Sequence, residues 1–307
     1  MSVDPRPTGT VVVGCDSSWA SQNAVAAATR EASRRCTELV LLAVVERRST
    51  WPDSLAWVTR VEAESRQETQ SAVDLAMARV VATDPAVAVR AVVVREVDSP
   101  ELTDVARPAG LLVLGRRGDG GQVAFSLGST SWELARRFHC PILVVHDQVS
   151  PADSHRFGPD RAVVAGMDIL GGAGAVLLVA VTEAVIRDLP LIVVHALPHG
   201  HEVDRTVIDE GWRKCRAALG EARLPAEVPT RLVITQDDPV PALLNRVAPG
   251  DLLVVGTRGQ GRLAGLVTPS VSREILNAMT CDVMVVQPGL TAASPVTPEL
   301  VDLAGGS

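Results

Sequence analysis

Leu111–Gly118 (LLVLGRRG) returns in the second half of the chain as Leu252–Gly259 (LLVVGTRG), and this repeat decides the fold. Each copy is a short apolar run that ends in two glycines with two residues between them. Such a run, closed by a glycine turn, is typical of a strand that is buried on both faces of a sheet. Because each copy lies in its own half of the chain, the sequence predicts two copies of a whole domain rather than a short-period solenoid.

Two further pairs of segments support the duplication. Val11–Asp16 (VVVGCD) corresponds to Val163–Asp168 (VVAGMD), and Cys140–Val145 (CPILVV) corresponds to Cys281–Val286 (CDVMVV). The matching segments keep their order in both halves. The repeat therefore spans the full length of each predicted domain.

Apolar runs and helical patterns alternate in each half. Strands are expected at 10–15, 39–45, 87–94, 111–114 and 142–146, then at 161–167, 190–196, 228–235, 251–255 and 283–287. Helices are expected in the first half at 20–35, 55–82, 100–107 and 129–138. This alternation requires crossover connections and a parallel sheet. The fold class is α/β, with two tandem open doubly wound domains, each a five-stranded parallel sheet with helices on both faces.

Proline, glycine and polar residues mark the domain boundaries. The expected division is an N-terminal extension at 1–8, a first domain at 9–147, a linker at 148–160, a second domain at 161–288 and a disordered tail at 289–307. The run Ala162–Val181 is mostly apolar, but it contains Asp168 and a Gly171-Gly172 pair. A charge at the middle of a bilayer is costly, so a buried strand, a glycine turn and a buried helix explain this run better than a membrane span.

The composition of the chain indicates which binding partners are unfavourable and in which cellular compartment the protein is expected. The formal net charge of −7 argues against non-specific binding of nucleic acid or of an anionic membrane. Five cysteines without a CxxC pair, none at metal-ligand spacing with the histidines, favour a reducing cytosol. Residues 1–7 lack the apolar stretch of a signal peptide. A cytoplasmic protein with no membrane segment, no nucleic-acid partner and no metal ligands of its own is expected.

A second glycine pair makes the end of the fourth strand a candidate ligand site. Gly115-x2-Gly118-x9-Gly128-Ser129 combines tight turns with the start of a helix, where free backbone amides favour an anion. Thr130 and Glu133 also match a capping box, in which the helix satisfies its own amides. From the spacing alone, both a phosphate-binding loop and a self-capping turn remain open.

The same spacing resembles the nucleotide-binding signature of the universal stress protein family. Asp16 at the end of the first strand, the small residues Ser18, Ser21 and Ala24, and the last strand after Cys140 also resemble that family. The overall resemblance covers nearly the whole chain, once in each half. The resemblance implies ATP across the strand ends, with Mg²⁺ or Mn²⁺ on its phosphates. Asp16 and Val44 would hold the adenosine, and the remaining contacts would come from Gly115, Arg116, Gly118, Gly128, Ser129 and Thr130. The alternative to these binding roles is that Asp16 only forms hydrogen bonds within the turn that follows it, and that Arg116 is only a solvated loop residue.

The second half departs from the pattern. Its corresponding residues are Asp168, Gly256, Arg258, Gly259 and Ser270. Pro269 replaces the glycine that precedes the serine, and proline has no N–H to donate. Ala196 stands where Val44 stands in the first half, and Ile169-Leu170 replaces small polar residues. A weakened second site is expected.

These features favour an ATP-binding regulatory protein that acts in stress response or dormancy through regulatory partners that the sequence does not name. The alternatives are a slow ATPase or related nucleotide-dependent enzyme, and an interaction module without nucleotide. The chain has no Gly-x4-Gly-Lys-Ser/Thr loop and only one lysine, Lys214, so a phosphate-clamping lysine is missing. The apolar final strands, 142–146 and 283–287, are predicted to pack the two halves together and to form a homodimer.

Overall fold

The computed structural model describes residues 9–45, 55–95, 97, 99–116, 129–146, 161–167, 174–196, 205–221, 228–257 and 271–287. The expected extension at 1–8, the linker at 148–160 and the tail at 289–307 lie outside the described residues. The first half contains β1 (Thr10–Gly14), α1 (Trp19–Arg35), β2 (Leu39–Val44), α2 (Leu55–Thr83), β3 (Val89–Val94), α3 (Pro100–Ala106), β4 (Ala109–Gly115), α4 (Ser129–Arg137) and β5 (Ile142–Val145). The second half contains β6 (Val163–Gly166), α5 (Gly174–Arg187), β7 (Leu191–Ala196), α6 (Arg205–Glu221), β8 (Thr230–Thr235), α7 (Pro239–Leu244), β9 (Leu252–Gly256), α9 (Val271–Ala278) and β10 (Asp282–Val286).

The predicted strands are confirmed within a few residues at each end, because strands buried on both faces read as continuous apolar runs. Neighbouring strands within each half are parallel, in the order β3-β2-β1-β4-β5 and its counterpart β10-β9-β6-β7-β8. Each half is therefore an open sheet whose strand order reverses beside its first strand, as expected for a doubly wound domain.

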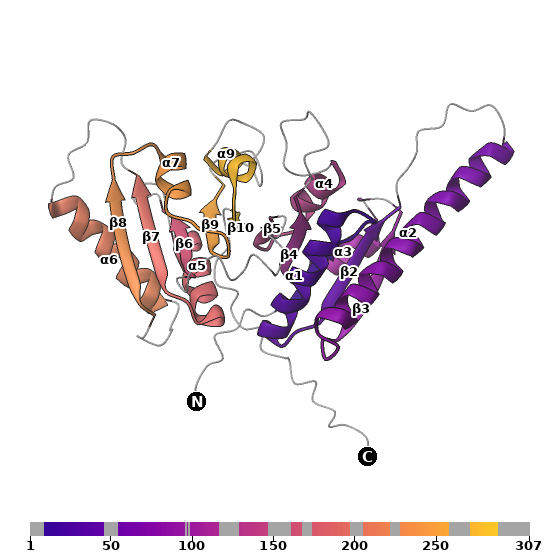
Figure 1. Ribbon diagram of the computed structural model, residues 1–307, viewed down its shortest axis with the longest axis horizontal. Helices are drawn as coiled ribbons and strands as arrows, with labels where there is room; N and C mark the ends of the chain where they lie inside the picture. The colour runs from indigo at the N-terminus through magenta and orange to yellow at the C-terminus, as the bar shows by residue number, and fades with distance from the viewer. Residues whose placement is uncertain are drawn as a thin grey trace, which may run out of the picture.

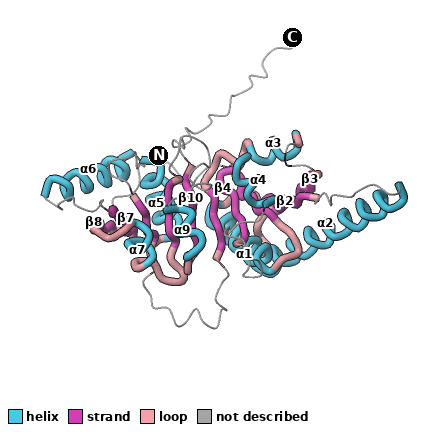
Figure 2. The backbone as a smooth tube through the Cα atoms, turned by 90° about the horizontal axis from the view of Figure 1, so that it is seen from above, coloured by secondary structure: helices cyan, strands magenta, loops and turns pink. Residues whose placement is uncertain are grey.

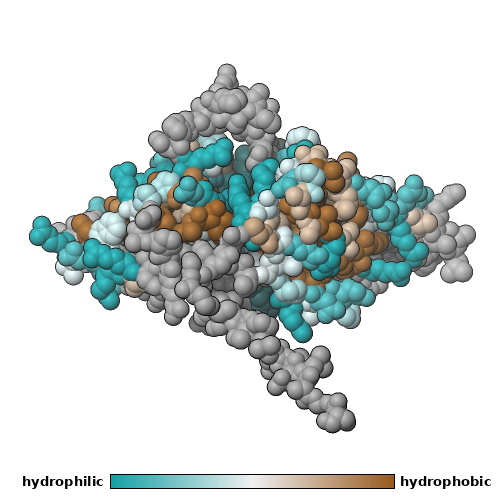
Figure 3. Space-filling model, turned by 90° about the horizontal axis from the view of Figure 1, so that it is seen from below, coloured by the Kyte–Doolittle hydropathy of each residue, from teal (hydrophilic) through white to brown (hydrophobic). Residues whose placement is uncertain are grey.

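Helices cover both faces of the sheet (Figures 1 and 2). One apolar cluster joins the sheet to α1, α2, α5 and α6, and the other joins it to α3, α4, α7 and α9. Both clusters contain residues of both halves, so the core is continuous across the domain boundary. Among the described residues, the exposed large apolar side chains are Trp19, Leu75, Val81, Val93 and Ile208. Apolar residues also show on both halves of the face seen in Figure 3.

The two halves form one sheet, because β5 pairs antiparallel with β10. Ile142, Leu143 and Val144 lie opposite Val285, Met284 and Val283 in the ladder. This confirms the prediction that the halves pack through their final strands. It also removes the reason given for the homodimer, since these two strands are central in the ten-stranded sheet and its outer strands are β3 and β8. The homodimer itself stays a prediction.

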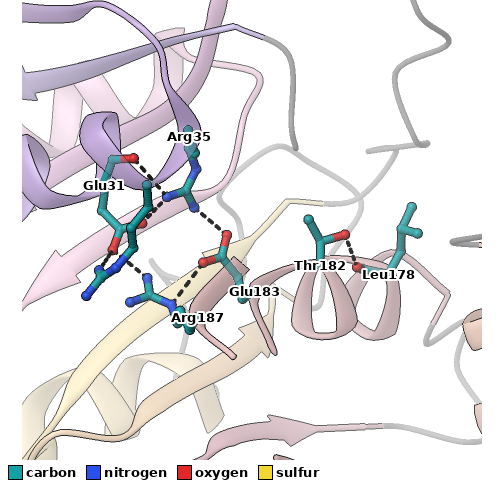
Figure 4. A network of polar contacts seen from close by, with 7 residues as sticks. Glu31, Arg35, Leu178, Thr182, Glu183 and Arg187 are labelled. Carbon is teal, nitrogen blue, oxygen red and sulfur yellow. Dashed lines mark hydrogen bonds and ion pairs between the residues drawn. The ribbon is translucent and has the colours of Figure 1, made fainter. Parts of the chain in front are cut away.

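A buried group of charges joins α1 to α5 (Figure 4). The interdomain charge cluster consists of Glu31, Arg35, Glu183 and Arg187. Arg35 donates to both carboxylates, and so does Arg187, whose Nη2 lies 2.7 Å from Oε1 of Glu31 and whose Nε lies 3.1 Å from Oε2 of Glu183. Arg34 at the edge of the cluster also donates to Glu31, at 2.7 Å, so each buried carboxylate has at least two arginine partners, which compensates for its burial.

Glu31 is held in its charged form by this arrangement. Burial alone would raise its pKa, but the guanidinium groups of Arg187, Arg35 and Arg34 outweigh burial and lower the pKa to about 2. Glu31 is therefore charged over the whole neutral range, and its ion pairs with Arg35 and Arg187 hold the first helices of the two domains together.

Within the apolar run Ala162–Val181, the predicted strand and helix are confirmed as β6 and the start of α5, and the predicted glycine turn lies outside the described residues. In the part of the chain that the structure describes, no helix is both long enough and apolar enough to cross a membrane.

Candidate functional site

The candidate site of the first domain lies where β2, β1 and β4 end side by side. These strands are neighbours in the sheet, in that order. Val44 ends β2 and is half-buried, Asp16 follows β1, and Gly115 ends β4. The chain reverses its direction of winding between β1 and β4, and such a switch point is where open α/β sheets bind ligands. The structure thus brings together three of the predicted site residues.

Asp16 organises the turn between β1 and α1. Its Oδ1 accepts from the backbone N–H of Ser18 at 2.8 Å, and its own N–H donates to Oγ of Ser21 at 2.9 Å. Ser18 caps α1 by accepting from the N–H of Ser21. The turn proposed as the competing role of Asp16 is therefore present. The Asp16 side chain is nonetheless exposed, and the turn occupies only one of its two carboxylate oxygens.

Gly115 allows the first turn of α1 to lie directly on the end of β4. A Cβ at this position would come within 2.5 Å of the carbonyl oxygen of Ala20. A real side chain cannot approach a backbone atom so closely, so only glycine fits. Gly115 thus sets the distance between β4 and the Asp16 turn, whatever ligand it contacts.

Arg116 is partly exposed and is not the freely solvated side chain of the alternative from sequence. Its Nη2 donates to the backbone carbonyl of Asn277 in α9 at 3.3 Å, across the domain boundary. Its Nε is buried and has no hydrogen-bond partner among the described residues. The positive charge lies at the C-terminal end of α9, where a helix dipole favours a cation.

The helix that was expected to receive phosphate, α4, begins at Ser129. Thr130 is exposed and lies inside the first turn, so the capping box with Thr130 at the N-cap is wrong by position. Gly118 and Gly128 lie outside the described residues, as does the side chain of Ser129. The described part of the loop therefore provides an exposed hydroxyl and the start of a helix.

The second domain repeats the glycine at the strand end but changes its neighbours. A Cβ on Gly256 would come within 2.9 Å of Val176 in α5, as the duplication predicts. The carbonyl of Gly256 accepts from the Ser272 hydroxyl at 2.6 Å. Thr257, the counterpart of Arg116, is buried, and its hydroxyl has no hydrogen-bond partner among the described residues. The other predicted residues, Asp168, Arg258, Gly259 and Ser270, lie outside the described residues.

One polar residue near this second site was missed. His195 lies near the end of β7, is buried, and its Nδ1 is 2.8 Å from the carbonyl oxygen of Met167. A carbonyl only accepts, so Nδ1 carries the proton. The available signal was a histidine within the otherwise apolar run Leu191–Ala196, which the sequence interpretation passed over.

The cysteine beside Asp16 is not a reactive group. Burial, reinforced by the charge of Asp16, raises the pKa of the Cys15 thiol to about 12. A protonated thiol is a poor nucleophile and a poor metal ligand. Within the described ranges, no three His, Cys, Asp or Glu side chains gather closely enough to hold a metal ion.

These features define a class: a tandem α/β protein made of two copies of one open domain, each with a glycine at the end of its switch-point strand. The family model described as the universal stress protein family matches residues 7–146 and again residues 161–287. The chain belongs to this family.

Individual relatives agree with the match over the full length. Universal stress protein Rv2005c of Mycobacterium tuberculosis is 32% identical over 294 residues, which cover 92% of this chain and 98% of that protein. Universal stress protein Rv2623 of the same organism is 30% identical, with 92% and 97% covered. The crystal structure of a universal stress protein from Archaeoglobus fulgidus matches with a TM-score of 0.67 at 17% identity, and covers 91% of this chain and 98% of that chain. The last likeness supports the fold alone.

Proposed function

We propose that this universal stress protein is a regulatory protein that binds ATP, with its principal site in the first domain. The observation that carries the proposal is the juxtaposition of Asp16 and Gly115. The Asp16 turn leads into α1, and the carbonyl of Ala20 in α1 packs on Gly115. An exposed carboxylate and a strand end on which α1 packs closely therefore lie together at a switch point, where a ribose requires a hydrogen-bond acceptor.

The described groups fit the parts of an adenine nucleotide in order along the strand ends. Val44 offers an apolar surface to the base, and the carboxylate oxygen of Asp16 that the turn does not use offers an acceptor to the sugar hydroxyls. The start of α4, with Ser129 and Thr130, offers amides and a hydroxyl to the phosphates. Mg²⁺ or Mn²⁺ would bind mainly to phosphate oxygens and water, as Mg²⁺ usually does with nucleotides.

The second domain is proposed to bind nucleotide more weakly. Ala196 gives the base less apolar surface than Val44 does, and Pro269 removes one amide donor. At the position equivalent to Arg116, the second domain has Thr257, a buried hydroxyl in place of a guanidinium. Each change removes a contact that the first domain can make.

A regulatory role suits this site better than a dedicated enzyme. The only lysine, Lys214, lies in α6 rather than at a strand end, and the neighbouring Cys15 thiol stays protonated. ATP would therefore act as a bound signal that partner proteins detect. The cytoplasmic location, the homodimer and the stress or dormancy context are parts of the same proposal.

The test is the nucleotide content of the purified full-length chain. The protein is denatured, and the released small molecules are separated by chromatography against adenine nucleotide standards. ATP should be released from the wild-type protein and not from a folded Asp16→Ala variant. Asp16→Asn, which keeps an acceptor for the Ser18 amide, separates loss of charge from loss of the turn. Protein that neither carries ATP nor binds it when supplied would refute the function.

A further inference from the structure

The C-terminal end of α4 is held by a residue of the other domain. Gln287, which follows β10, is buried, and its Nε2 donates to the carbonyl oxygens of Ala135 and Phe138 at 3.2 and 3.1 Å. The last carbonyls of a helix have no partner within the helix. Gln287 therefore caps these two carbonyls from the second domain, while His139 of the first domain lies with its Nδ1 3.2 Å from the carbonyl oxygen of Arg137.

The position of Gln287 is set by the sheet and not by α4. Val286, the residue before it, pairs with Gly256 in β9, and β10 lies between β9 and β5 at the centre of the sheet. α4 has nine residues, so its two ends are about 13 Å apart. A short rigid helix tilts as a unit. A hydrogen bond at one end therefore helps to determine where the other end, the start at Ser129, lies.

The opposite contact exists as well. Arg116, at the end of β4 in the first domain, donates to Asn277 near the C-terminal end of α9 in the second domain. Each domain thus holds the C-terminal end of the helix that follows the glycine strand of the other. Figure 1 shows α4 and α9 above the paired strands β5 and β10. Because β5 and β10 pair antiparallel, the contact of Gln287 with α4 and the contact of Arg116 with α9 both cross the boundary between the two domains.

We propose that Gln287 is a positioning residue for the nucleotide site of the first domain, through its bonds to the last turn of α4, and that the site is incomplete without the second domain. The inference rests on the proposed function, since it concerns the phosphate end of the same site. Gln287 touches no nucleotide and is not itself a binding residue. Its effect is to fix the direction in which the first turn of α4 presents its amides.

The experiment uses the full chain with Gln287→Met, which keeps the side-chain volume and removes the donor. ATP affinity is measured by calorimetry, and the first site is identified as the signal that Asp16→Ala removes. Affinity at that site should fall by about 3- to 20-fold, the usual range for residues that act through another element. In the protein without nucleotide, hydrogen exchange along 129–137 should become faster.

Arg246→Met is the matched control, because Arg246 donates to the carbonyl of Ala242 in α7 within its own domain. This variant should change neither ATP affinity nor exchange in α4. Wild-type affinity and wild-type α4 exchange in Gln287→Met would overturn the inference while leaving the proposed function intact. If the wild-type chain binds no ATP, the proposed function fails, and the exchange measurement still decides whether Gln287 positions α4. If Gln287→Met does not fold, Gln287→Asn, whose amide is one carbon shorter, carries the same expectations.

Discussion

Arg187 in the second domain donates from Nη2 to Oε1 of Glu31 in the first domain at 2.7 Å, and the Glu31 side chain is only 3% exposed. The same spacing, an acid followed by an arginine four residues later, occurs as Glu31 and Arg35 in α1 and as Glu183 and Arg187 in α5. The duplicated helices therefore meet through duplicated residues. This arrangement makes the domain boundary a fixed interface, which the cross-domain contacts of Gln287 and Arg116 require.

The first prediction concerns the cost of breaking the interdomain charge cluster. Arg187→Met should lower the free energy of unfolding by about 3–5 kcal/mol, because it leaves the two buried carboxylates with Arg35 as the only buried arginine that contacts both. Adding Glu31→Gln should recover part of this loss, with a coupling of about 0.5–3 kcal/mol in a double-mutant cycle. Denaturant unfolding measures the free energy of unfolding of the wild type, the two single variants and the double variant.

The control for this cycle is Arg90→Met, which breaks the exposed pair between Arg90 and Glu38. Exposed pairs contribute about 0–1 kcal/mol, so this variant should remain close to the wild type. Equal losses for Arg187→Met and Arg90→Met would show that the cluster has no special role.

The second prediction is a pH dependence of stability. The pKa of Glu31 is about 2 in the folded protein, compared with its ordinary value of 4.5. The contribution of Glu31 to stability is therefore complete above pH 4.5 and is lost as the pH falls from 4.5 towards 2. It amounts to about 3 kcal/mol at neutral pH. Buried Asp282 acts in the opposite direction, because burial raises its pKa.

The measurement compares wild type with Glu31→Gln by denaturant unfolding at pH 7 and at successively lower pH, so that other carboxyl groups cancel in the difference. The stability gap should be constant above pH 4.5 and should shrink below it. A gap that stays constant down to pH 3 would contradict the charged cluster.

The third prediction separates two glycines by the space around them. Gly115→Ala should destabilise the chain by about 1–3 kcal/mol, because the new Cβ meets the backbone of Ala20. Gly174→Ala, at the start of α5, meets nothing within 4 Å and should leave stability unchanged or raise it by up to about 1 kcal/mol. Melting temperatures decide the order, and a more stable Gly115→Ala variant would refute the close packing of α1 on β4.

The fourth prediction concerns thiol reactivity. Burial raises the pKa of Cys15, Cys140 and Cys281 to about 12 each, while Cys36 is exposed at the end of α1. In the native protein at pH 8, a thiol reagent should modify Cys36 rapidly and these three only after unfolding. Mass mapping identifies the sites, with Cys36→Ser as the control. Rapid modification of Cys15 in the native protein would contradict its burial.

The strand positions and the duplication could be predicted because buried parallel strands leave continuous apolar runs. Polar contacts at the domain boundary could not. The spacing of Glu31 and Arg35 is also typical of a solvent-exposed ion pair on a helix. Their burial depends on Glu183 and Arg187 of α5, which lie in the other half of the chain. The bonds of Gln287 and Arg116 depend on the antiparallel pairing of β5 and β10, which brings distant helix ends together. A strand edge pairs only once, so the edges of β5 and β10 that join the two halves cannot also join two chains.

The fifth prediction is tested by calorimetric titration of the full chain with ATP and Mg²⁺, the most direct measurement of the central claim. The account predicts one tight site per chain, lost in folded Asp16→Ala and weakened in Gly118→Ala, which adds a Cβ to the predicted glycine loop. The second site should bind about 10- to 100-fold more weakly, the effect of one missing hydrogen bond to a charged phosphate, and Pro269→Gly should strengthen it. The absence of ATP binding, or tight binding that is unchanged in both folded first-domain variants, would contradict the assigned site. Two equal tight sites would contradict the asymmetry.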